Sequence, residues 1–402
     1  MVRKIKGVSE MAIIFKERGI RKQNKRLVAF ICLLFFLFVS AFSFAESDQN
    51  AITLIDQPDR QIEIKDEKIP SVKKGISLVT GKQSKVSYQP VLVEFNNENG
   101  GIYATAPKGI TKASVIYEYQ MLTNGTMGIS AIFQDDLVPA GPVGNASVGG
   151  LLIQNDWNCG YVYQAIPTNA DGSVSELGYS IQNWIDSYSL VFKRVLFPGD
   201  ASKTKEWKKY FKMDPEMLSD ENQTVKTEGI HEILEKNNHE ASKPMFVFMT
   251  DKEIDNYEGD IPVREIDIRM SSRAFSSGFV YDDNSKEYYR WIGENNQYGD
   301  VDADEQLHVS NLIIQRVSYT TANKMMAPNT IGRGNADIFL LGSYIEGYWV
   351  RDSLDEHTRY YDSEGNLIHL VPGSTYIALL SNTTSVVILN YEIAPVEMEV
   401  YE

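Results

Sequence analysis

Residues 331–380 constrain the fold of this chain more than any other stretch, because short apolar runs alternate there with turn residues. The run at 336–341 is apolar except for one aspartate and is short enough for a single strand. Gly342 and Ser343 follow it and suit a tight hairpin, since glycine takes the positive φ that such turns require. Residues 362–365 have turn composition, with Asp first and Gly last. The stretch is therefore predicted to be a meander of β-strands.

The strand predicted after this hairpin alternates its side chains between two faces. Ile345, Gly347 and Trp349 fall on one face, and the residues between them fall on the other. A glycine between bulky neighbours indicates a close approach of another group, so we expect an aromatic ring to lie across the backbone at Gly347.

The aromatic residues of the same stretch allow two interpretations. Stacked rings can grip a sugar or a protein partner, which makes Trp349 a candidate ligand-binding residue. In a β-rich domain with few sulfur atoms, such rings more often fill the core, and we favour that interpretation. The cluster comprises Tyr344, Tyr348, Trp349, Tyr360 and Tyr361.

The glycines and aromatic residues of this stretch resemble the carboxy-terminal domain of the YerB-like family, bacterial envelope proteins built around a domain of unknown function (DUF3048). The similar motifs are Gly332-x-Gly334, Gly342, Gly347-x-Trp349, Tyr361-Asp362-x-x-Gly365 and Leu370-x-Pro372-Gly373. Further marks of the family are Tyr289-Arg290, Asp300 and Asn311-x-Ile313-x-Gln315. The resemblance extends from about residue 90 to residue 381. It implies a secreted or lipid-anchored protein and implies no particular enzymatic activity.

The amino-terminal residues have the pattern of an export signal. Residues 1–26 carry nine Lys or Arg and two acids, and residues 27–45 are uncharged and largely apolar. Small residues at Ser43 and Ala45 suit cleavage after residue 45, whereas the apolar length also suits an uncleaved membrane anchor. We favour cleavage. The residues before Cys32 do not form a lipidation signal, so lipidation is not expected.

The charge balance disfavours partners that carry many phosphates. The chain has a net charge of −15, and removal of a segment of net charge +7 would leave −22. We therefore expect no nucleic-acid partner, and anionic lipid surfaces are disfavoured, because phosphate contacts require clustered Lys and Arg. Only Cys159 lies beyond the signal segment, so no internal disulfide is expected and the fold must depend on its core.

The fold class predicted from these patterns is α+β with two domains. Residues 46–88 are predicted to be a linker, 89–260 an α/β domain with helices packed on a mixed sheet, 263–382 a mostly β domain, and 383–402 a tail. Helices are predicted at 110–121, 146–157, 173–185, 203–211 and 225–236. Strands of the first domain are predicted at 91–95, 129–134, 160–166, 190–197 and 245–249.

The first half resembles the family at Pro90-Val91, Gly109, Ala113, Tyr117-Glu118, Phe133 and Gly141-Pro142-Val143. Where the family carries three arginines, this chain has Gly128, Gly144 and Ser147, and a family histidine is also missing near residues 163–165. Two interpretations remain open. The family has an anion-binding cleft here that this chain has lost or changed, or the arginines only stabilise the fold through ion pairs.

Common catalytic and metal-binding signatures are missing. The glycines around Ser147 lack the spacing of a nucleophile elbow, and the five histidines are scattered. Cys159 is interpreted as a buried structural thiol. Alternate carboxylates from Asp300 to Asp304 could bind calcium, but the spacing fits poorly and an acidic solvated turn is favoured. We therefore predict no metal and no cofactor.

The best interpretation is a secreted or membrane-tethered envelope protein that binds a cell-wall component or another envelope protein without catalysis. Its oligomeric state is not predicted. One alternative is a cell-wall polymer hydrolase that uses Glu118 and Asp300. Another is a solute-binding protein of a transporter. The candidate ligand-binding residues are Tyr117, Glu118, Gly141, Pro142, Val143, Asp300, Asn311 and Trp349.

Overall fold

A computed structural model describes residues 51–54, 63–65, 73–97, 107–169, 171, 173–187, 196–199, 209–214, 223–259, 261–270, 276–293, 296–300, 305–354 and 356–390. The predicted signal segment, Cys32 and the end of the predicted tail lie outside these residues. No helix of the described residues has the length and apolar character needed to cross a membrane. All described residues except Ala51 belong to one compact unit, which begins at Ile52.

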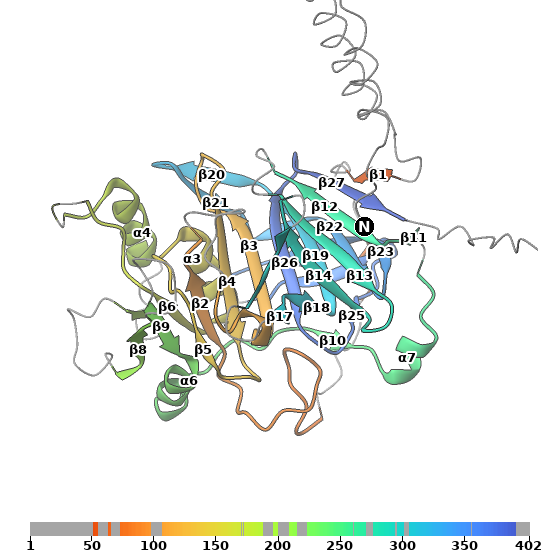
Figure 1. Cartoon of the computed structure of the whole chain (residues 1–402), viewed down its shortest axis with the longest axis horizontal. Helices are drawn as coiled ribbons and strands as arrows, with labels where there is room; N and C mark the ends of the chain where they lie inside the picture. The colour runs from red at the N-terminus through yellow and green to blue at the C-terminus, as the bar shows by residue number, and fades with distance from the viewer. Residues whose placement is uncertain are drawn as a thin grey trace, which may run out of the picture. The chain divides into compact units, whose positions relative to one another are not determined.

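The described residues are mostly β, with four α-helices and several sheets. The largest sheet has eleven strands in the order β11-β23-β22-β19-β26-β3-β4-β2-β6-β7, with β24 added beside β23 (Figure 1). Its members are β2 (Val91–Phe95), β3 (Val115–Gln120), β4 (Met127–Phe133), β6 (Gly160–Tyr163), β7 (Leu196–Pro198), β11 (Ile261–Pro262), β19 (Asn311–Val317), β22 (Gly332–Leu340), β23 (Ser343–Arg351), β24 (Arg359–Asp362) and β26 (Thr375–Ser381).

A second sheet packs on one face of the large one. Its strands lie in the order β27-β12-β13-β14-β15, with β18 beside β14. They are β12 (Glu265–Arg269), β13 (Ser277–Asp282), β14 (Glu287–Ile292), β15 (Asn296–Gln297), β18 (His308–Val309) and β27 (Ser385–Leu389), and β1 (Ala51–Leu54) belongs to the same sheet.

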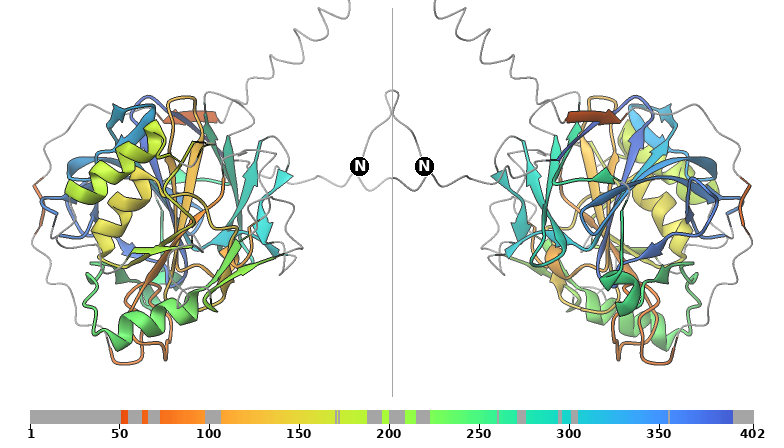
Figure 2. Two further views of the ribbon diagram at one scale, coloured as in Figure 1. Left: turned by 90° about the vertical axis from the view of Figure 1, so that its left-hand side faces the viewer. Right: turned by 90° about the vertical axis from the view of Figure 1, so that its right-hand side faces the viewer.

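The other strands form small sheets: β5 (Pro139–Ala140), β8 (Phe211–Met213), β9 (Gln223–Lys226), β10 (Val247–Phe248), β16 (Gly299–Asp300), β17 (Glu305–Gln306), β20 (Tyr319–Ala322), β21 (Met325–Pro328) and β25 (His369–Leu370). The helices are the 3₁₀-helix η3 (Ile110–Lys112) and the α-helices α3 (Val148–Trp157), α4 (Glu176–Ser187), α6 (Thr227–Lys236) and α7 (Asp251–Asp255). In Figure 2, α3 and α4 lie together on one side of the large sheet.

The large sheet separates two apolar cores, because successive side chains of a strand point to opposite faces. Along β26, Tyr376 and Ala378 belong to the core against the second sheet, whereas Ile377 and Leu379 belong to the core shared with α3 and α4. Burial on both faces explains why every residue of β19 is buried and why its sequence shows no polar alternation.

The two predicted domains share the large sheet. Strand β26, from the second half, pairs in parallel with β3 of the first half on one side and with β19 on the other. Residues 89–260 and 263–382 therefore contribute neighbouring strands to a single sheet in the described part of the chain.

The prediction of a helix at residues 110–121 is wrong. Only Ile110–Lys112 form a short 3₁₀-helix, and Val115–Gln120 form β3 in the middle of the large sheet. Residues with β-branched and aromatic side chains fill this strand and are buried on both faces, so the apparent helical spacing came from a fully buried strand.

The other predicted helices have mixed outcomes. Those at 146–157, 173–185 and 225–236 are confirmed as α3, α4 and α6, with shifted ends. Of the helix predicted at 203–211, residues 203–208 lie outside the described residues and Phe211 begins β8. Strands β2, β4, β6 and β10 confirm four of the five strand predictions, and β7 overlaps the fifth, of which residues 190–195 lie outside the described part.

The hairpin at the centre of the meander turns one residue earlier than predicted. Leu341 and Gly342 both have positive φ, and Leu340 pairs with Ser343 across the turn. The close contact expected of an aromatic ring at Gly347 occurs instead at Gly334, where an added Cβ would lie 2.6 Å from Nε1 of Trp349. At Gly347 the near neighbours are the Ile338 side chain and a backbone oxygen.

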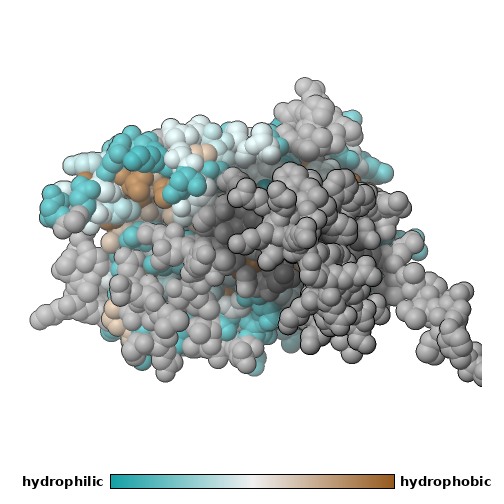
Figure 3. All heavy atoms as spheres, turned by 45° about the horizontal axis from the view of Figure 1, so that its top comes forward, coloured by the Kyte–Doolittle hydropathy of each residue, from teal (hydrophilic) through white to brown (hydrophobic). Residues whose placement is uncertain are grey.

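The aromatic cluster of the meander fills the core. Tyr344, Tyr348, Trp349, Tyr360 and Tyr361 are each at most 8% exposed. The described part of the face drawn in Figure 3 is mainly hydrophilic, and its hydrophobic residues show only in small, separate areas. These rings therefore provide no stacking surface for a sugar.

Candidate functional site

Tyr117 and Glu118 lie on opposite faces of the large sheet, because they are successive residues of β3. Tyr117 is buried in the core beside α3, where its hydroxyl accepts a hydrogen bond of 2.8 Å from Nε1 of Trp157. Glu118 points toward the second sheet. The two side chains therefore cannot line one groove.

Glu118 is held in a buried ion pair between the sheets. Its Oε1 lies 2.9 Å from Nη2 of Arg290, and both residues are at most 2% exposed. The hydroxyls of Ser277 and Tyr376 donate to the same carboxylate at 3.0 and 2.9 Å. The guanidinium of Arg290 also lies 4.0 Å from the centre of the Tyr298 ring. This carboxylate is fully engaged inside the protein.

Gly141, Pro142 and Val143 use their backbone to hold neighbouring segments together. The Gly141 N–H donates to the Lys108 carbonyl, and the Pro142 carbonyl accepts from the Asn96 N–H. An added Cβ at Gly141 would lie 2.8 Å from the Gln223 carbonyl oxygen, so a larger residue has no room. The structure assigns this segment to packing.

Asn311 and Trp349 also make internal hydrogen bonds. The Asn311 side chain is fully buried, donates to the Val371 carbonyl and accepts from the Val371 N–H, at 2.9 and 2.8 Å. Nε1 of Trp349 donates to the Arg316 carbonyl at 2.7 Å. Asn311 thereby fixes the turn that follows residue 371.

Asp300 is buried at 5% exposure and accepts a hydrogen bond of 3.3 Å from the Thr111 hydroxyl. The neighbouring Asp302 and Asp304 of the predicted acidic turn lie outside the described residues. No group of three or more metal-ligating side chains occurs among the residues that the structure describes.

The positions of the missing family arginines surround a buried carboxylate, Glu94. Its oxygens accept hydrogen bonds from the hydroxyls of Tyr119, Tyr161, Ser130 and Ser147, at 2.6 to 3.2 Å. Ser147 also caps the start of α3. Burial raises the pKa of Glu94 to about 7, although the four hydroxyls act to lower it.

Glycines close around this carboxylate and leave no room for longer side chains. An added Cβ at Gly128 would lie 2.5 Å from the Tyr119 ring, and one at Gly144 would lie 2.7 Å from a backbone oxygen. In this protein Glu94 and the two tyrosines occupy the space beside the start of α3. An arginine at Gly128 or Gly144 would not fit without rearrangement.

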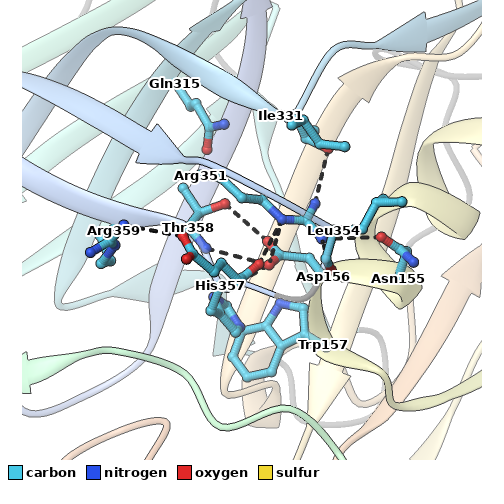
Figure 4. A network of polar contacts seen from close by, with 12 residues as sticks. Asn155, Asp156, Trp157, Gln315, Ile331, Arg351, Leu354, His357, Thr358 and Arg359 are labelled. Carbon is cyan, nitrogen blue, oxygen red and sulfur yellow. Dashed lines mark hydrogen bonds and ion pairs between the residues drawn. The ribbon is translucent and has the colours of Figure 1, made fainter.

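A second buried network joins α3 to the loop between β23 and β24. Arg351 is fully buried, with Nη2 donating to Asn155 at 3.1 Å and Nε 3.5 Å from Asp156 (Figure 4). Asp156 also accepts a hydrogen bond of 3.0 Å from the Thr358 hydroxyl. The His357 ring packs edge-on against Trp157, and burial lowers the pKa of His357. The network is buried and connects α3 to this loop.

One open groove, with a volume of about 840 Å³, lies where both halves of the chain meet residues 74–86. Its basic lining residues are Lys74, Lys82, Lys85, Lys112 and His308. Acidic lining residues are Asp135, Asp136 and Glu287. Hydroxyl groups come from Thr80, Ser84, Thr111, Ser114 and Ser374. The lining is therefore polar, with potential donors for hydrogen bonds on several sides.

Part of this lining is already paired within the protein. His308 lies between two carboxylates, 2.6 Å from Glu287 and 3.1 Å from Glu305, and these contacts raise its pKa. Nζ of Lys112 lies 3.0 Å from Glu305. The Thr80 hydroxyl donates to Asp135 at 2.7 Å. The other three basic residues of the lining, Lys74, Lys82 and Lys85, form no ion pair within the described residues, and all three belong to residues 74–85.

The family motifs shape the groove without projecting charge into it. Asn311 fixes residue 371, and the Gly373 N–H donates to the Thr80 carbonyl at 2.8 Å. Gly373 and Ser374 then line the groove. Nζ of Lys82 lies over this turn, 3.5 Å from where a Cβ on Gly373 would be.

Residues 74–86 lie within the segment that was predicted to be a linker, 46–88, and they form one side of the groove. Residues 76–83 form a small hairpin, with a bridge between Ile76 and Gln83 and a hydrogen bond from the Ser77 N–H to the Lys82 carbonyl. Val79 is fully buried in the core beside α3. The lysine spacing from residue 74 to residue 85 was visible in the sequence, but only packing shows that it faces a groove.

Comparison with known proteins supports the resemblance seen in the motifs. Residues 266–377, from β12 into β26, match the family described as "Protein of unknown function (DUF3048) C-terminal domain". No curated protein sequence matches the chain.

A solved structure with a similar fold is that of the YerB protein from Bacillus subtilis. The match has a TM-score of 0.58 at 16% sequence identity, and it covers 77% of this chain and 99% of YerB. At this identity the likeness concerns the fold. Residues 266–377 therefore match the C-terminal domain of the DUF3048 family, and the chain shares its fold with YerB.

Proposed function

We propose that this protein works outside the membrane as a non-catalytic binding module, and that its ligand is a cell-wall component or another envelope protein held in the groove. The observation that carries the proposal is the open polar groove itself, which is lined by both halves of the chain and by the family turn at Gly373. The basic and apolar amino-terminal segments in the sequence support export.

The surroundings of the candidate acids favour binding over hydrolysis. Glu118 is paired with Arg290 and covered by protein, so it cannot approach a polymer. Asp300 is also buried and accepts a hydrogen bond from Thr111. Glycoside hydrolysis needs two carboxylates that face the substrate from a cleft.

The shared sheet counts against a solute-binding subunit of a transporter. Such a protein would hold its ligand between two separate α/β lobes, whereas here β26 of the second half lies directly beside β3 of the first. The groove lies at the edge of this common structure, beside η3 and the hairpin at residues 76–83.

We further propose that residues 89–260 are the layered α/β part of the fold. Ile230 and Leu234 of α6 belong to the core on one face of the large sheet, and α3 and α4 contribute to the core on the other. Helices on both faces of these strands are what a layered arrangement requires.

The test is co-sedimentation of the full chain, in mild detergent, with isolated cell walls. We expect the wild-type protein to sediment with the walls and Gln83→Trp, which fills the groove without changing charge, to stay in solution. Asn382→Trp places the same bulk at an exposed position of another loop and should behave as the wild type. Failure of the wild type to sediment, or release of soluble wall fragments by it, would contradict the proposal.

A further inference from the structure

Three lysines of one short hairpin segment converge on the groove of an acidic chain. Lys74, Lys82 and Lys85 are exposed and line the groove, although the whole chain has a net charge of −15. The segment is held in place by backbone hydrogen bonds on both sides of the hairpin, including one of 2.9 Å from the Ser84 N–H to the Gly75 carbonyl. The lysines are therefore presented from an ordered support.

These lysines differ from the other cations of the groove in their partners. Lys112 and His308 are paired with Glu305, and His308 also with Glu287. Within the described residues, Lys74, Lys82 and Lys85 form no salt bridge. Asp135 and Asp136 also line the groove, but within the described residues neither carboxylate forms an ion pair with these three lysines, so the ammonium groups can bind a ligand anion.

The type of lining indicates which anion fits. Lysine binds phosphate as a point charge, whereas the planar fork of arginine suits carboxylates in a bidentate manner. The described lining contains four lysines, several hydroxyl groups and no arginine. It also contains no tyrosine, tryptophan or phenylalanine, so it has no aromatic surface on which a sugar ring would stack.

We propose that the groove binds a phosphate group through Lys74, Lys82 and Lys85, with Ser84 and Ser374 as nearby hydroxyl donors. This inference deepens the proposed function, on which it rests, by naming the chemical class of the ligand. The acidic chain repels a densely charged polymer at long range, so the ligand carries an isolated phosphate monoester or diester. The shared chemistry is the phosphate, in a wall polymer or a lipid headgroup.

The experiment is calorimetric titration of the full chain with glycerol 3-phosphate and with glycerophosphoglycerol, at low and high salt. We expect the wild type to bind at least one of them, with affinity that falls in 0.5 M salt because charges at an open groove are screened. The triple variant Lys74→Gln, Lys82→Gln, Lys85→Gln should bind at least tenfold more weakly. Lys243→Gln, an exposed lysine outside the groove, should leave affinity unchanged.

Further measurements distinguish a wall or soluble phosphate from a lipid headgroup, and they distinguish failure of the phosphate proposal from failure of the proposed function. Binding of free phosphates points to a wall or soluble ligand, whereas triple-variant-sensitive binding only to phosphatidylglycerol vesicles points to a lipid headgroup. Absence of all phosphate binding in the wild type, or equal binding by the triple variant, overturns the inference. If the wild type still sediments with walls in that case, the proposed function stands without it.

Discussion

The Glu118–Arg290 pair and the lysine groove both join the two halves of the chain, but they use charge in opposite ways. At the pair, a carboxylate from β3 and a guanidinium from β14 lie 2.9 Å apart and are almost fully buried. At the groove, three ammonium groups face solvent with no carboxylate partner among the described residues. The first arrangement fixes how the sheets pack, and the second leaves charge available for a ligand.

This difference explains why the types of residue in the sequence did not identify the groove as the candidate binding site. Charged residues that resemble a site in the sequence, such as Glu118, are held by internal partners. Residues that looked like part of a linker carry the charge that remains open. Burial of a charge is costly without a partner, so a buried acid is usually a paired one.

Breaking the buried pair should give the largest effect. Arg290→Met leaves the Glu118 carboxylate buried without its cation, and we expect it to lower the free energy of unfolding by roughly 3–5 kcal/mol. Urea unfolding followed by circular dichroism measures this. The double variant Arg290→Met, Glu118→Gln removes both charges and should lose less than Arg290→Met alone. An Arg290→Met protein as stable as the wild type would show that the pair does not hold the sheets together.

Glu94 adds a third case to this comparison, because its buried carboxylate is bound by four hydroxyl groups and has no cation beside it. Its folded pKa, about 7, lies above its ordinary value of 4.5, so the folded state binds the proton more tightly. Stability should therefore fall as pH rises from about 4.5 to 7, by roughly 3 kcal/mol, and then level off.

The measurement for Glu94 is urea unfolding between pH 4.5 and 8 for the wild type and for Glu94→Gln. The variant has no group to titrate at this position, so its stability should change less over this range. Asp171→Asn, at an exposed loop, is the matched control and should keep the wild-type profile above pH 5. An unchanged pH profile in Glu94→Gln would show that Glu94 is not the group responsible.

His308 combines features of both regions, because it lines the groove and is also paired with Glu287 and Glu305. Glu287 and then Glu305 raise its pKa, against the lowering effect of burial. Its stabilising contribution should be complete below its unfolded pKa and should disappear as pH rises through the folded pKa. We expect His308→Gln to melt at a lower temperature than the wild type at pH 5.5, with a smaller difference at pH 9. A difference in melting temperature that grows with pH would contradict this assignment.

The smallest effect on stability is expected from changing the three exposed lysines of the groove. The triple variant Lys74→Gln, Lys82→Gln, Lys85→Gln removes exposed charges without salt-bridge partners in the described chain, so the free energy of unfolding should change by no more than about 0.5 kcal/mol. Urea unfolding at pH 7 measures it. A loss of several kcal/mol would mean that these lysines stabilise the fold and are not free for a ligand.

Elements with strong local signals could be predicted from the sequence alone. The turns at Gly342 and at residues 362–365 follow from glycine and aspartate chemistry, and α3, α4 and α6 were predicted from their own residues. The family motifs were also visible in the sequence, because they are glycine and aromatic positions in short, turn-bounded strands.

Other features depend on contacts in the folded chain and could not be predicted from local sequence patterns. Residues 115–120 became a central strand because both of their faces are buried, which removes the alternation that would identify a strand. Glu118 became a core residue because Arg290, 172 positions away, comes to lie beside it. The lysines of residues 74–85 face a groove because their hairpin packs against the turn at Gly373. Burial and charge pairing depend on contacts between distant residues, and those contacts exist only in the folded chain.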